Sequence, residues 1–194
     1  MEAQAQLKPP VQPGRNRLTL IALIAVALAP VVLSYLAYYV WKPSGGRSYG
    51  QLLEVRPLPD FPLASLDGKP ARLDEFRRKW LLVMVDDAAC GKDCMDALFA
   101  LRQYRLSQGK EMHRIERLWL VTGEGQPSAA ALRQADGAAI RRALAPVPLP
   151  GELQRGIYLI DPLGNQVVRY PRDAETGRVI KELVRFLKNN ESLG

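Results

Sequence analysis

Residues 80–94 read WLLVMVDDAACGKDC, and this stretch decides the fold of the 194-residue chain. Its first part, Trp80 to Val85, is a continuous apolar run, which is typical of a strand buried on both faces of a sheet. Its last part, Cys90-Gly-Lys-Asp-Cys94, holds the only two cysteines of the chain. A buried strand that leads through a short loop to two thiols at the start of a helix predicts a reactive sulfur site just beyond the end of that strand.

Two thiols at this spacing can exchange with other disulfides, hold a soft metal ion such as Cu(I), or form a structural bridge. On a continuous helix, side chains four positions apart have Cβ atoms about 5–6 Å apart, whereas an unstrained disulfide needs roughly 3.5–4.5 Å. We therefore expect the segment to loosen at Gly91 when the bridge closes. A bridge closed under strain is more easily reduced, and so short a loop constrains the unfolded chain weakly. The spacing favours a redox or metal role for Cys90 and Cys94.

Strand and helix patterns alternate on both sides of the cysteines. Upstream, Asp67-Gly68 is a hairpin turn signal between the short segments 61–64 and 70–73. The elements predicted downstream are a helix through about residue 105, a strand at 117–122, a mainly helical segment at 127–145, strands at 156–161 and 166–170, and a final amphipathic helix that ends near Asn189. Parallel strands joined by helices and followed by an antiparallel hairpin are typical of an α/β, thioredoxin-like fold. We expect this fold with an N-terminal β-hairpin extension.

The N-terminal region contains 24 positions without a charge, Leu18 to Trp41. At about 1.5 Å per residue this run spans the ~30 Å hydrocarbon core of a bilayer. The alternative is a cleaved signal peptide, whose best site, Ala27-Leu-Ala29, is followed by an unsuitable proline, after which the apolar run continues. We therefore predict one uncleaved transmembrane helix preceding the folded domain.

The charges beside the span predict its orientation. Arg15 and Arg17 lie directly before it, which favours a cytoplasmic N-terminal tail and an external domain. In a bacterium this places the chain in the inner membrane and the cysteines in the periplasm, where disulfides persist. The predicted organisation is a cytoplasmic tail at 1–17, a transmembrane helix at 18–41, a linker at 42–56 and a single thioredoxin-like domain at 57–190.

The chain is basic, with a formal net charge of +7 and a sequence pI of about 9.6. Charges of both signs are interspersed, without an arginine-rich stripe and without aromatic residues among the basic ones. This pattern argues against nucleic acid as a partner. The lipid bilayer is the first partner that the sequence predicts.

The segment 59–94, PDFPLASLDGKPARLDEFRRKWLLVMVDDAACGKDC, resembles the thioredoxin-like branch that contains the Sco/SenC, ResA/TlpA and peroxiredoxin families. The three-residue spacer between the cysteines and the later segment 156–164, GIYLIDPLG, are similar to the Sco/SenC family in particular. The resemblance covers roughly residues 57–190. It implies a membrane-anchored, copper-linked assembly factor of cytochrome c oxidase, with a terminal oxidase subunit or copper-site protein as partner and Cu(I) on Cys90 and Cys94.

The chain departs from that family at the third copper ligand. Sco proteins carry a histidine shortly before the late strand, whereas residues 149–155 read LPGELQR. The segment Gly123–Pro127 also lacks the family's Asp-Pro pattern. The only histidine, His113, is expected in a surface loop far from the thiols, and Met95 is expected in the core. The metal set implied by the resemblance therefore stops at the two cysteines.

Two acids directly before the site, Asp86 and Asp87, have two interpretations. They cap the end of the strand, or they disfavour a thiolate by their charge or act as an acid–base pair. Lys92 and the helix N-terminus act in the opposite direction.

Three functions follow from these patterns. The leading one is thiol–disulfide exchange in assembly of the oxidase copper site, which would make the protein a thiol–disulfide oxidoreductase. Cys90 attacks a partner disulfide and Cys94 resolves the mixed disulfide. The alternatives are a Cu(I) carrier that uses both thiolates and a non-catalytic, membrane-tethered scaffold.

Overall fold

The N-terminal unit contains one long helix, α1 (Pro13–Val40). The structure is a computed structural model that describes residues 13–40, 48–150 and 156–190. Within α1, the 21 residues Arg17–Ala37 have a mean hydropathy of 2.5 and are long and apolar enough to cross a membrane. This confirms the predicted apolar helix, a type of segment that serves as an anchor or as a signal. The helix begins at Pro13, so the last residues of the predicted tail at 1–17 are helical.

The second unit, Ser48–Gly194, is built on a mixed eight-stranded sheet within its described residues. The strands are β1 (Gln51–Pro57), β2 (Leu63–Ala64), β3 (Pro70–Ala71), β4 (Trp80–Asp87), β5 (Ile115–Thr122), β6 (Ala139–Ala143), β7 (Gly156–Ile160) and β8 (Asn165–Pro171). Their spatial order is β1-β8-β7-β4-β5-β6-β2-β3. The helices are α2 (Lys92–Leu106), α3 (Ala129–Gln134) and α4 (Thr176–Asn189), with 3-10 turns η1 (Leu73–Phe76) and η2 (Gly109–Arg114).

The centre of the sheet follows the predicted α/β pattern. β4, β5 and β6 are parallel, with Trp80 opposite Ile115, and β7 and β8 form an antiparallel hairpin beside β4. The hairpin predicted around Asp67-Gly68 is also present, because β2 and β3 pair with Leu63 opposite Ala71. Gly68 has a φ of +84°, which suits the turn signal.

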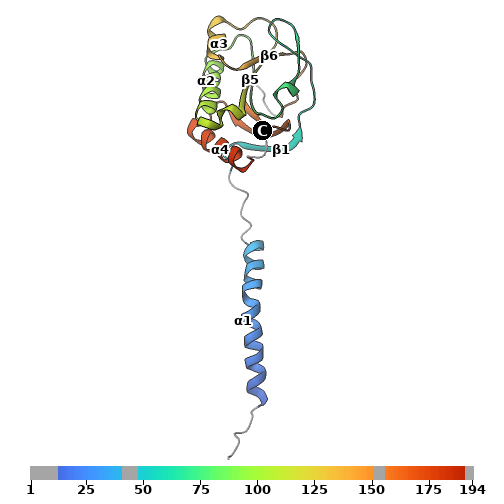
Figure 1. The fold of residues 1–194 in the computed structure, drawn as a ribbon, viewed down its shortest axis with the longest axis vertical. Helices are drawn as coiled ribbons and strands as arrows, with labels where there is room; N and C mark the ends of the chain where they lie inside the picture. The colour runs from blue at the N-terminus through green and yellow to red at the C-terminus, as the bar shows by residue number, and fades with distance from the viewer. Residues whose placement is uncertain (1–12, 41–47, 151–155, 191–194) are drawn as a thin grey trace, which may run out of the picture. The chain divides into compact units, whose positions relative to one another are not determined.

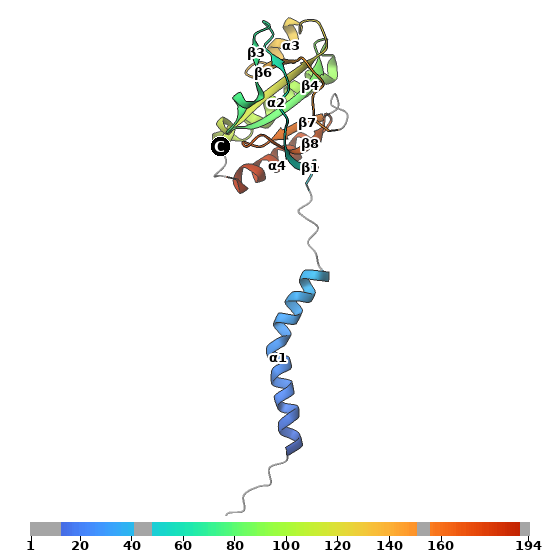
Figure 2. The ribbon, with the colours of Figure 1, turned by 90° about the vertical axis from the view of Figure 1, so that its right-hand side faces the viewer.

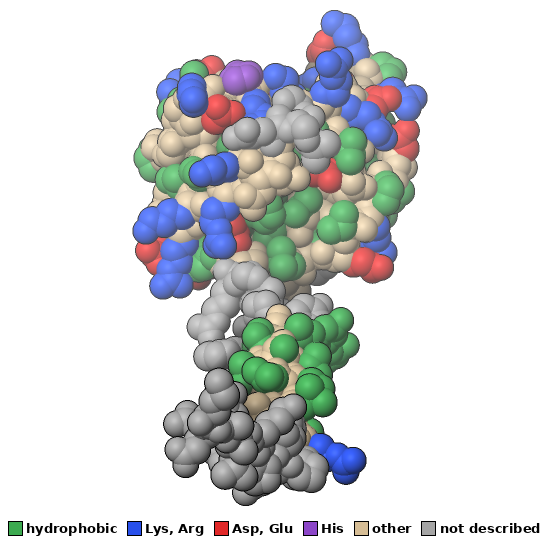
Figure 3. Space-filling model, turned by 60° about the horizontal axis from the view of Figure 1, so that its bottom comes forward, with side chains coloured by type: hydrophobic (Ala, Val, Ile, Leu, Met, Phe, Trp, Pro, Cys, Tyr) green, Lys and Arg blue, Asp and Glu red, His purple; other side chains and the backbone are tan. Residues whose placement is uncertain are grey.

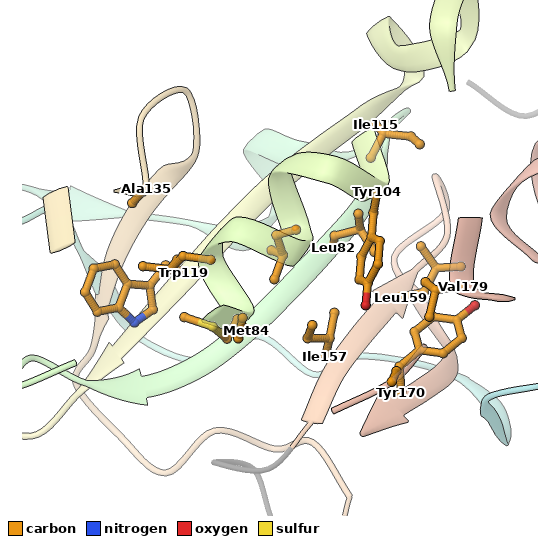
Figure 4. Close-up of a cluster of buried hydrophobic side chains, with 14 of the residues drawn as sticks. Leu82, Met84, Tyr104, Ile115, Trp119, Ala135, Ile157, Leu159, Tyr170 and Val179 are labelled. Atoms are coloured by element: carbon orange, nitrogen blue, oxygen red, sulfur yellow. The ribbon is translucent and has the colours of Figure 1, made fainter. Parts of the chain in front are cut away.

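All three helices of this unit cover one face of the sheet (Figures 1 and 2). The core on this face joins β4 and β5 to α2 and α4, and Figure 4 shows Leu82, Met84, Trp119 and Tyr170 within it. The opposite face has a second core around Leu81, Val83, Leu118 and Leu120 that is covered by loops and by η1. β4 is therefore buried on both faces, as its continuous apolar sequence predicts.

The segment 127–145 was predicted to be mainly helical, and this is wrong for its second half. α3 ends at Gln134, and Gly137 has a φ of +71°, a conformation that commonly follows the end of a helix. Ala139–Ala143 then forms β6, which pairs with β5 on one side and β2 on the other.

The predicted linker at 42–56 is wrong for residues 51–56. These residues belong to β1, an edge strand that pairs antiparallel with β8. The sequence lacks a strand signal here because most of β1 is exposed and its register shifts between Leu52 and Arg56. Residues 41–47 lie outside the described part of the chain.

Candidate functional site

The two cysteines are joined as a disulfide where β4 leads into α2. Gly91 is the N-cap residue of α2, so Cys90 lies just outside the helix and Cys94 lies in its first turn. Their Cα atoms are 5.0 Å apart. The unusual backbone conformation belongs to Cys90, whose φ is +40°, and not to Gly91, whose φ is −69°. The local distortion that we predicted at Gly91 is therefore one residue earlier, where a non-glycine residue in this region costs about 1–3 kcal/mol.

The disulfide lies at the boundary between the core and the surface. Cys94 is 2% exposed and Cys90 is 7% exposed. Both belong to the core on the helix face, whereas Gly91 and Lys92 beside them are exposed. Cys90 is thus the outer of the two sulfurs, as predicted, but both side chains are more deeply buried than the sequence indicated.

Asp87 holds the loop that carries Cys90. Its Oδ1 accepts hydrogen bonds from the backbone N–H groups of Ala89, at 2.9 Å, and Cys90, at 3.3 Å. An aspartate that binds backbone N–H groups two and three positions later stabilises a tight turn. The capping interpretation of this residue is therefore confirmed.

Asp86 is buried behind the loop, and its charge is balanced. Arg172 forms an ion pair with Asp86, with Nη2 2.6 Å from Oδ2, and donates a hydrogen bond to the Val85 carbonyl at 2.9 Å. The other carboxylate oxygen of Asp86 accepts the Asp87 N–H at 2.9 Å. Because Arg172 faces this carboxylate, the negative charge that was expected to disfavour a thiolate is offset. The sequence carries no signal for this pair, whose members are far apart in the chain.

Lys92 contributes less positive charge to the site than its position suggests. Its Nζ lies 2.5 Å from Asp96 Oδ2, four positions along α2. The Asp96 carboxylate raises the pKa of Lys92 through this hydrogen bond. The positive end of the α2 dipole therefore remains as the main feature that favours a thiolate at Cys90.

A glycine loop lies beside the cysteine loop. Gly123 and Gly125 have φ values of +70° and +94°, and a Cβ at Gly125 would lie 3.8 Å from the Ala88 Cβ. Arg142 of β6 donates to the carbonyls of both glycines. This loop replaces the Asp-Pro pattern noted in the sequence. The role of Arg142 could not be predicted, because its segment was expected to be helical.

His113 and Met95 are not brought to the disulfide as ligands. His113 is exposed in η2, next to the start of β5, and Figure 3 shows the histidine at the surface. The cysteines follow the far end of β4, which runs parallel to β5 for eight paired residues, or about 26 Å. Met95 is partly buried against the core. Both sequence interpretations are confirmed.

A family model described as "Transmembrane-like, thioredoxin-like, C-terminal domain" matches residues 80–190. This match includes β4, the cysteine pair and all three helices of the folded unit. The chain belongs to this family. The predicted thioredoxin-like fold is thereby confirmed, and the cysteine pair occupies the loop after the first central strand of this family's domain.

Solved structures of Sco proteins share the fold of this thioredoxin-like family member. Apo Sco1 from Thermus thermophilus has a TM-score of 0.55 at 20% identity and covers 75% of this chain and 98% of its own. Yeast Sco1 with copper bound has a TM-score of 0.54 at 15% identity, over 68% of this chain and 92% of its own. BsSco, described as a Sco-family cytochrome c oxidase assembly protein with a disulfide switch, has a TM-score of 0.55 at 13% identity, over 74% and 99%. A search of curated protein sequences gives no match.

The residues of this thioredoxin-like domain do not fit a three-ligand copper site. The two sulfurs are bonded to each other. Across residues 13–40, 48–150 and 156–190, no group of three or more His, Cys, Asp or Glu side chains is placed to hold a metal ion. The sequence of residues 149–155, where the Sco histidine is expected, contains no histidine.

Proposed function

We propose that this protein is a membrane-anchored thiol–disulfide exchange protein that prepares the copper site of a terminal oxidase. The observation that carries the proposal is the disulfide between Cys90 and Cys94, at the start of α2 and at the edge of the core. The fold shared with Sco1 and BsSco, the latter described with a disulfide switch, supports the same role.

The first step uses the outer sulfur of the reduced protein. The Cys90 thiolate attacks one sulfur of a client disulfide, forms a mixed disulfide and releases the other client sulfur as a thiolate. The N-terminus of α2 stabilises the attacking thiolate. Asp87 holds the Cys90 backbone in place while the sulfur reacts.

The second step returns the protein to the oxidised form. The Cys94 thiolate attacks Cys90 Sγ, closes the Cys90–Cys94 bond and releases the second client thiolate. The client gains two electrons and its dithiol can then bind copper, while this protein loses the same two electrons. An external dithiol must reduce the bridge again before the next cycle.

The location of the reaction follows from the N-terminal helix. We propose that Arg17–Ala37 anchors the chain in the bacterial inner membrane and that the folded unit lies in the periplasm. Arg15 and Arg17 support this orientation. Disulfides of a client also persist in that compartment.

A trapping experiment tests the exchange reaction with the full-length protein in an uncharged detergent. Cys94→Ala should accumulate a mixed disulfide with a peptide that contains an intrachain disulfide, since the resolving thiol is absent. Cys90→Ala is the matched control and should form at least tenfold less of this adduct. Equal adduct formation by the two variants, or none by either, would refute the proposed mechanism.

The two alternative functions give different results in the same system. A glutathione titration of the wild-type protein should show one two-electron transition for the Cys90–Cys94 pair. A Cu(I) carrier would instead bind one Cu(I) per chain through both thiolates and show no exchange. A scaffold would support oxidase assembly fully in the Cys90→Ala, Cys94→Ala double variant.

A further inference from the structure

Three arginines of β5 and α2 lie on the helix-covered side of the sheet, away from the cysteine loop. Arg117 lies in β5 on the same face as Ile115 and Trp119 and is only 4% exposed. Arg102 and Arg105 lie one turn apart in the second half of α2. Burial lowers the pKa of Arg117 most, and the positive charges of Arg105 and Arg102 lower it further.

The hydrogen bonds of this cluster leave much of its charge without a partner. Arg117 Nη2 donates to the Asp136 carbonyl at 2.7 Å, and Arg105 Nε donates to the Ile115 carbonyl at 2.7 Å. The buried Nε of Arg117 has no hydrogen-bond partner among the described residues. Backbone carbonyls bind these guanidinium groups without neutralising them.

The nearby acids do not balance the three arginines. The carboxylates of Asp136 and Glu116 favour the charged form of Arg117, but less strongly than the two arginines oppose it. In the described part of the chain, no carboxylate forms an ion pair with any of the three guanidinium groups. A buried cation beside two like charges destabilises a fold unless an anion joins it.

The turn after α3 forms the remaining wall of this cluster. Gly137 has a φ of +71°, and a Cβ there would lie 2.9 Å from Arg117 Nη2. In Figure 4, Ala135 at the start of this turn lies beside Trp119, two residues along β5 from Arg117. The backbone of the turn thus approaches the Arg117 guanidinium closely.

We propose that Arg102, Arg105 and Arg117 form a binding site for an oxyanion of the phosphate or sulfate class. Guanidinium groups bind such oxygens through paired N–H donors, and several of them together match a multiply charged tetrahedral anion. The site does not involve the thiols, so this proposal does not depend on the proposed exchange reaction.

Thermal unfolding of the full-length protein in an uncharged detergent tests this site. We expect inorganic phosphate at ten times its dissociation constant to raise the Tm by roughly 3–6 °C relative to chloride at equal ionic strength. Arg117→Met should abolish this increase. It should also unfold at the same or a higher temperature than the wild type without phosphate, because an apolar side chain replaces an unpaired buried charge.

Control variants distinguish a specific anion-binding site from a general effect of charge. Arg56→Met removes the same charge from the exposed edge strand β1 and should keep the full increase in Tm. If Arg117→Met does not fold, Arg102→Met with Arg105→Met should weaken phosphate binding at least tenfold in calorimetry.

Nanodiscs with neutral or anionic phospholipids, without free phosphate, distinguish a lipid headgroup from the free ion. An equal response of Arg56→Met and Arg117→Met, or none in the wild type, would overturn the proposal.

Discussion

At the residue scale, the cysteine loop depends on a side chain from a distant part of the sequence. Arg172 follows β8 and binds both the Asp86 carboxylate and the Val85 carbonyl at the end of β4. The side chains of the pair are 16% and 11% exposed, so solvent screens their interaction only partly. This pair fixes the point from which the loop departs toward Cys90.

Replacement of Arg172 should therefore affect both stability and thiol reactivity. We expect Arg172→Met to lower the free energy of unfolding by about 2–4 kcal/mol, because the Asp86 carboxylate is left largely buried without its partner. We also expect slower alkylation of the reduced protein by iodoacetamide at pH 7, since that negative charge disfavours the thiolate. Urea unfolding and alkylation rates measure the two effects. Asp86→Asn in the same chain should restore most of the alkylation rate, and failure to do so would show that the charge is not the cause.

Tyr104 gives the domain a predictable response to alkaline pH. Its side chain is fully buried, and burial, with a smaller effect of Tyr49, raises its pKa to about 12. Below pH 10 the phenol is neutral in both the folded and unfolded states. Above pH 10 it ionises first in the unfolded chain, so stability is lost between about pH 10 and 12, by roughly 2–3 kcal/mol.

The Tyr104→Phe variant isolates this contribution. The phenol oxygen has no hydrogen bond of ordinary geometry among the described residues, and the Thr176 side chain has only the smallest of the effects on its pKa. Its removal should therefore change the stability at pH 7 by less than about 1 kcal/mol. Urea unfolding at pH 8 and pH 11 should show a smaller loss of stability in the variant than in the wild type. Burial also raises the pKa of Tyr170. Both the variant and the wild type should therefore keep part of the loss of stability at alkaline pH. An identical pH dependence of the two proteins would contradict this assignment.

At the scale of elements, the sequence predicts the helices and strands whose side chains follow a regular pattern of burial. β4 is buried on both faces and α4 is amphipathic, and both were found within a few residues of their bounds. β1 and β6 were missed because their side chains are exposed or half-buried throughout, so neither shows an alternating pattern. The cysteine pair and the Asp87 turn were predictable from local sequence. Arg142 and Arg172 act on residues that only the tertiary fold brings to them.

α4 also fixes the first residues of the folded unit. Glu182 is 6% exposed and accepts hydrogen bonds from the Ser48 hydroxyl at 2.6 Å and from the N–H groups of Tyr49 and Gly50 at 2.9 and 3.1 Å. Gly50 is required here, because a Cβ would lie 2.5 Å from the Val168 side chain. The start of the domain is thus held by a carboxylate on its last helix.

Removal of the Glu182 carboxylate should release this segment. We expect Glu182→Ala to lower the free energy of unfolding by about 3 kcal/mol, since three hydrogen bonds to a charged acceptor are lost. Hydrogen exchange at the Tyr49 and Gly50 amides should accelerate more than exchange in β4. Glu124→Ala, which removes an exposed carboxylate, is the control and should change the stability by less than about 0.5 kcal/mol. Unchanged exchange at both amides would show that Glu182 does not hold the segment.

At the scale of the whole molecule, the proposed exchange reaction requires the folded unit to face an oxidising compartment. The chain has only two cysteines, so a thiol label reports the location of the disulfide directly. Charges of both signs are interspersed on the face of the unit that Figure 3 shows, so the arginines beside the apolar helix are the main orientation signal that the sequence offers.

Labelling of bacterial spheroplasts should therefore reveal the thiols without lysis. After reduction by a membrane-impermeant phosphine, we expect a membrane-impermeant maleimide to label intact and lysed spheroplasts to the same extent. Burial of the sulfurs slows labelling equally in both samples. The ratio of labelling in intact to lysed spheroplasts therefore reports only whether the membrane separates the reagent from the thiols. Cys90→Ala with Cys94→Ala supplies the unlabelled control. Arg15→Glu with Arg17→Glu should reduce the ratio of labelling in intact to lysed spheroplasts, because the positive charges that favour the proposed orientation are then reversed. Labelling confined to lysed cells would place the disulfide in the cytoplasm, where reduced thiols predominate, and the proposed cycle of oxidation and reduction could not operate there.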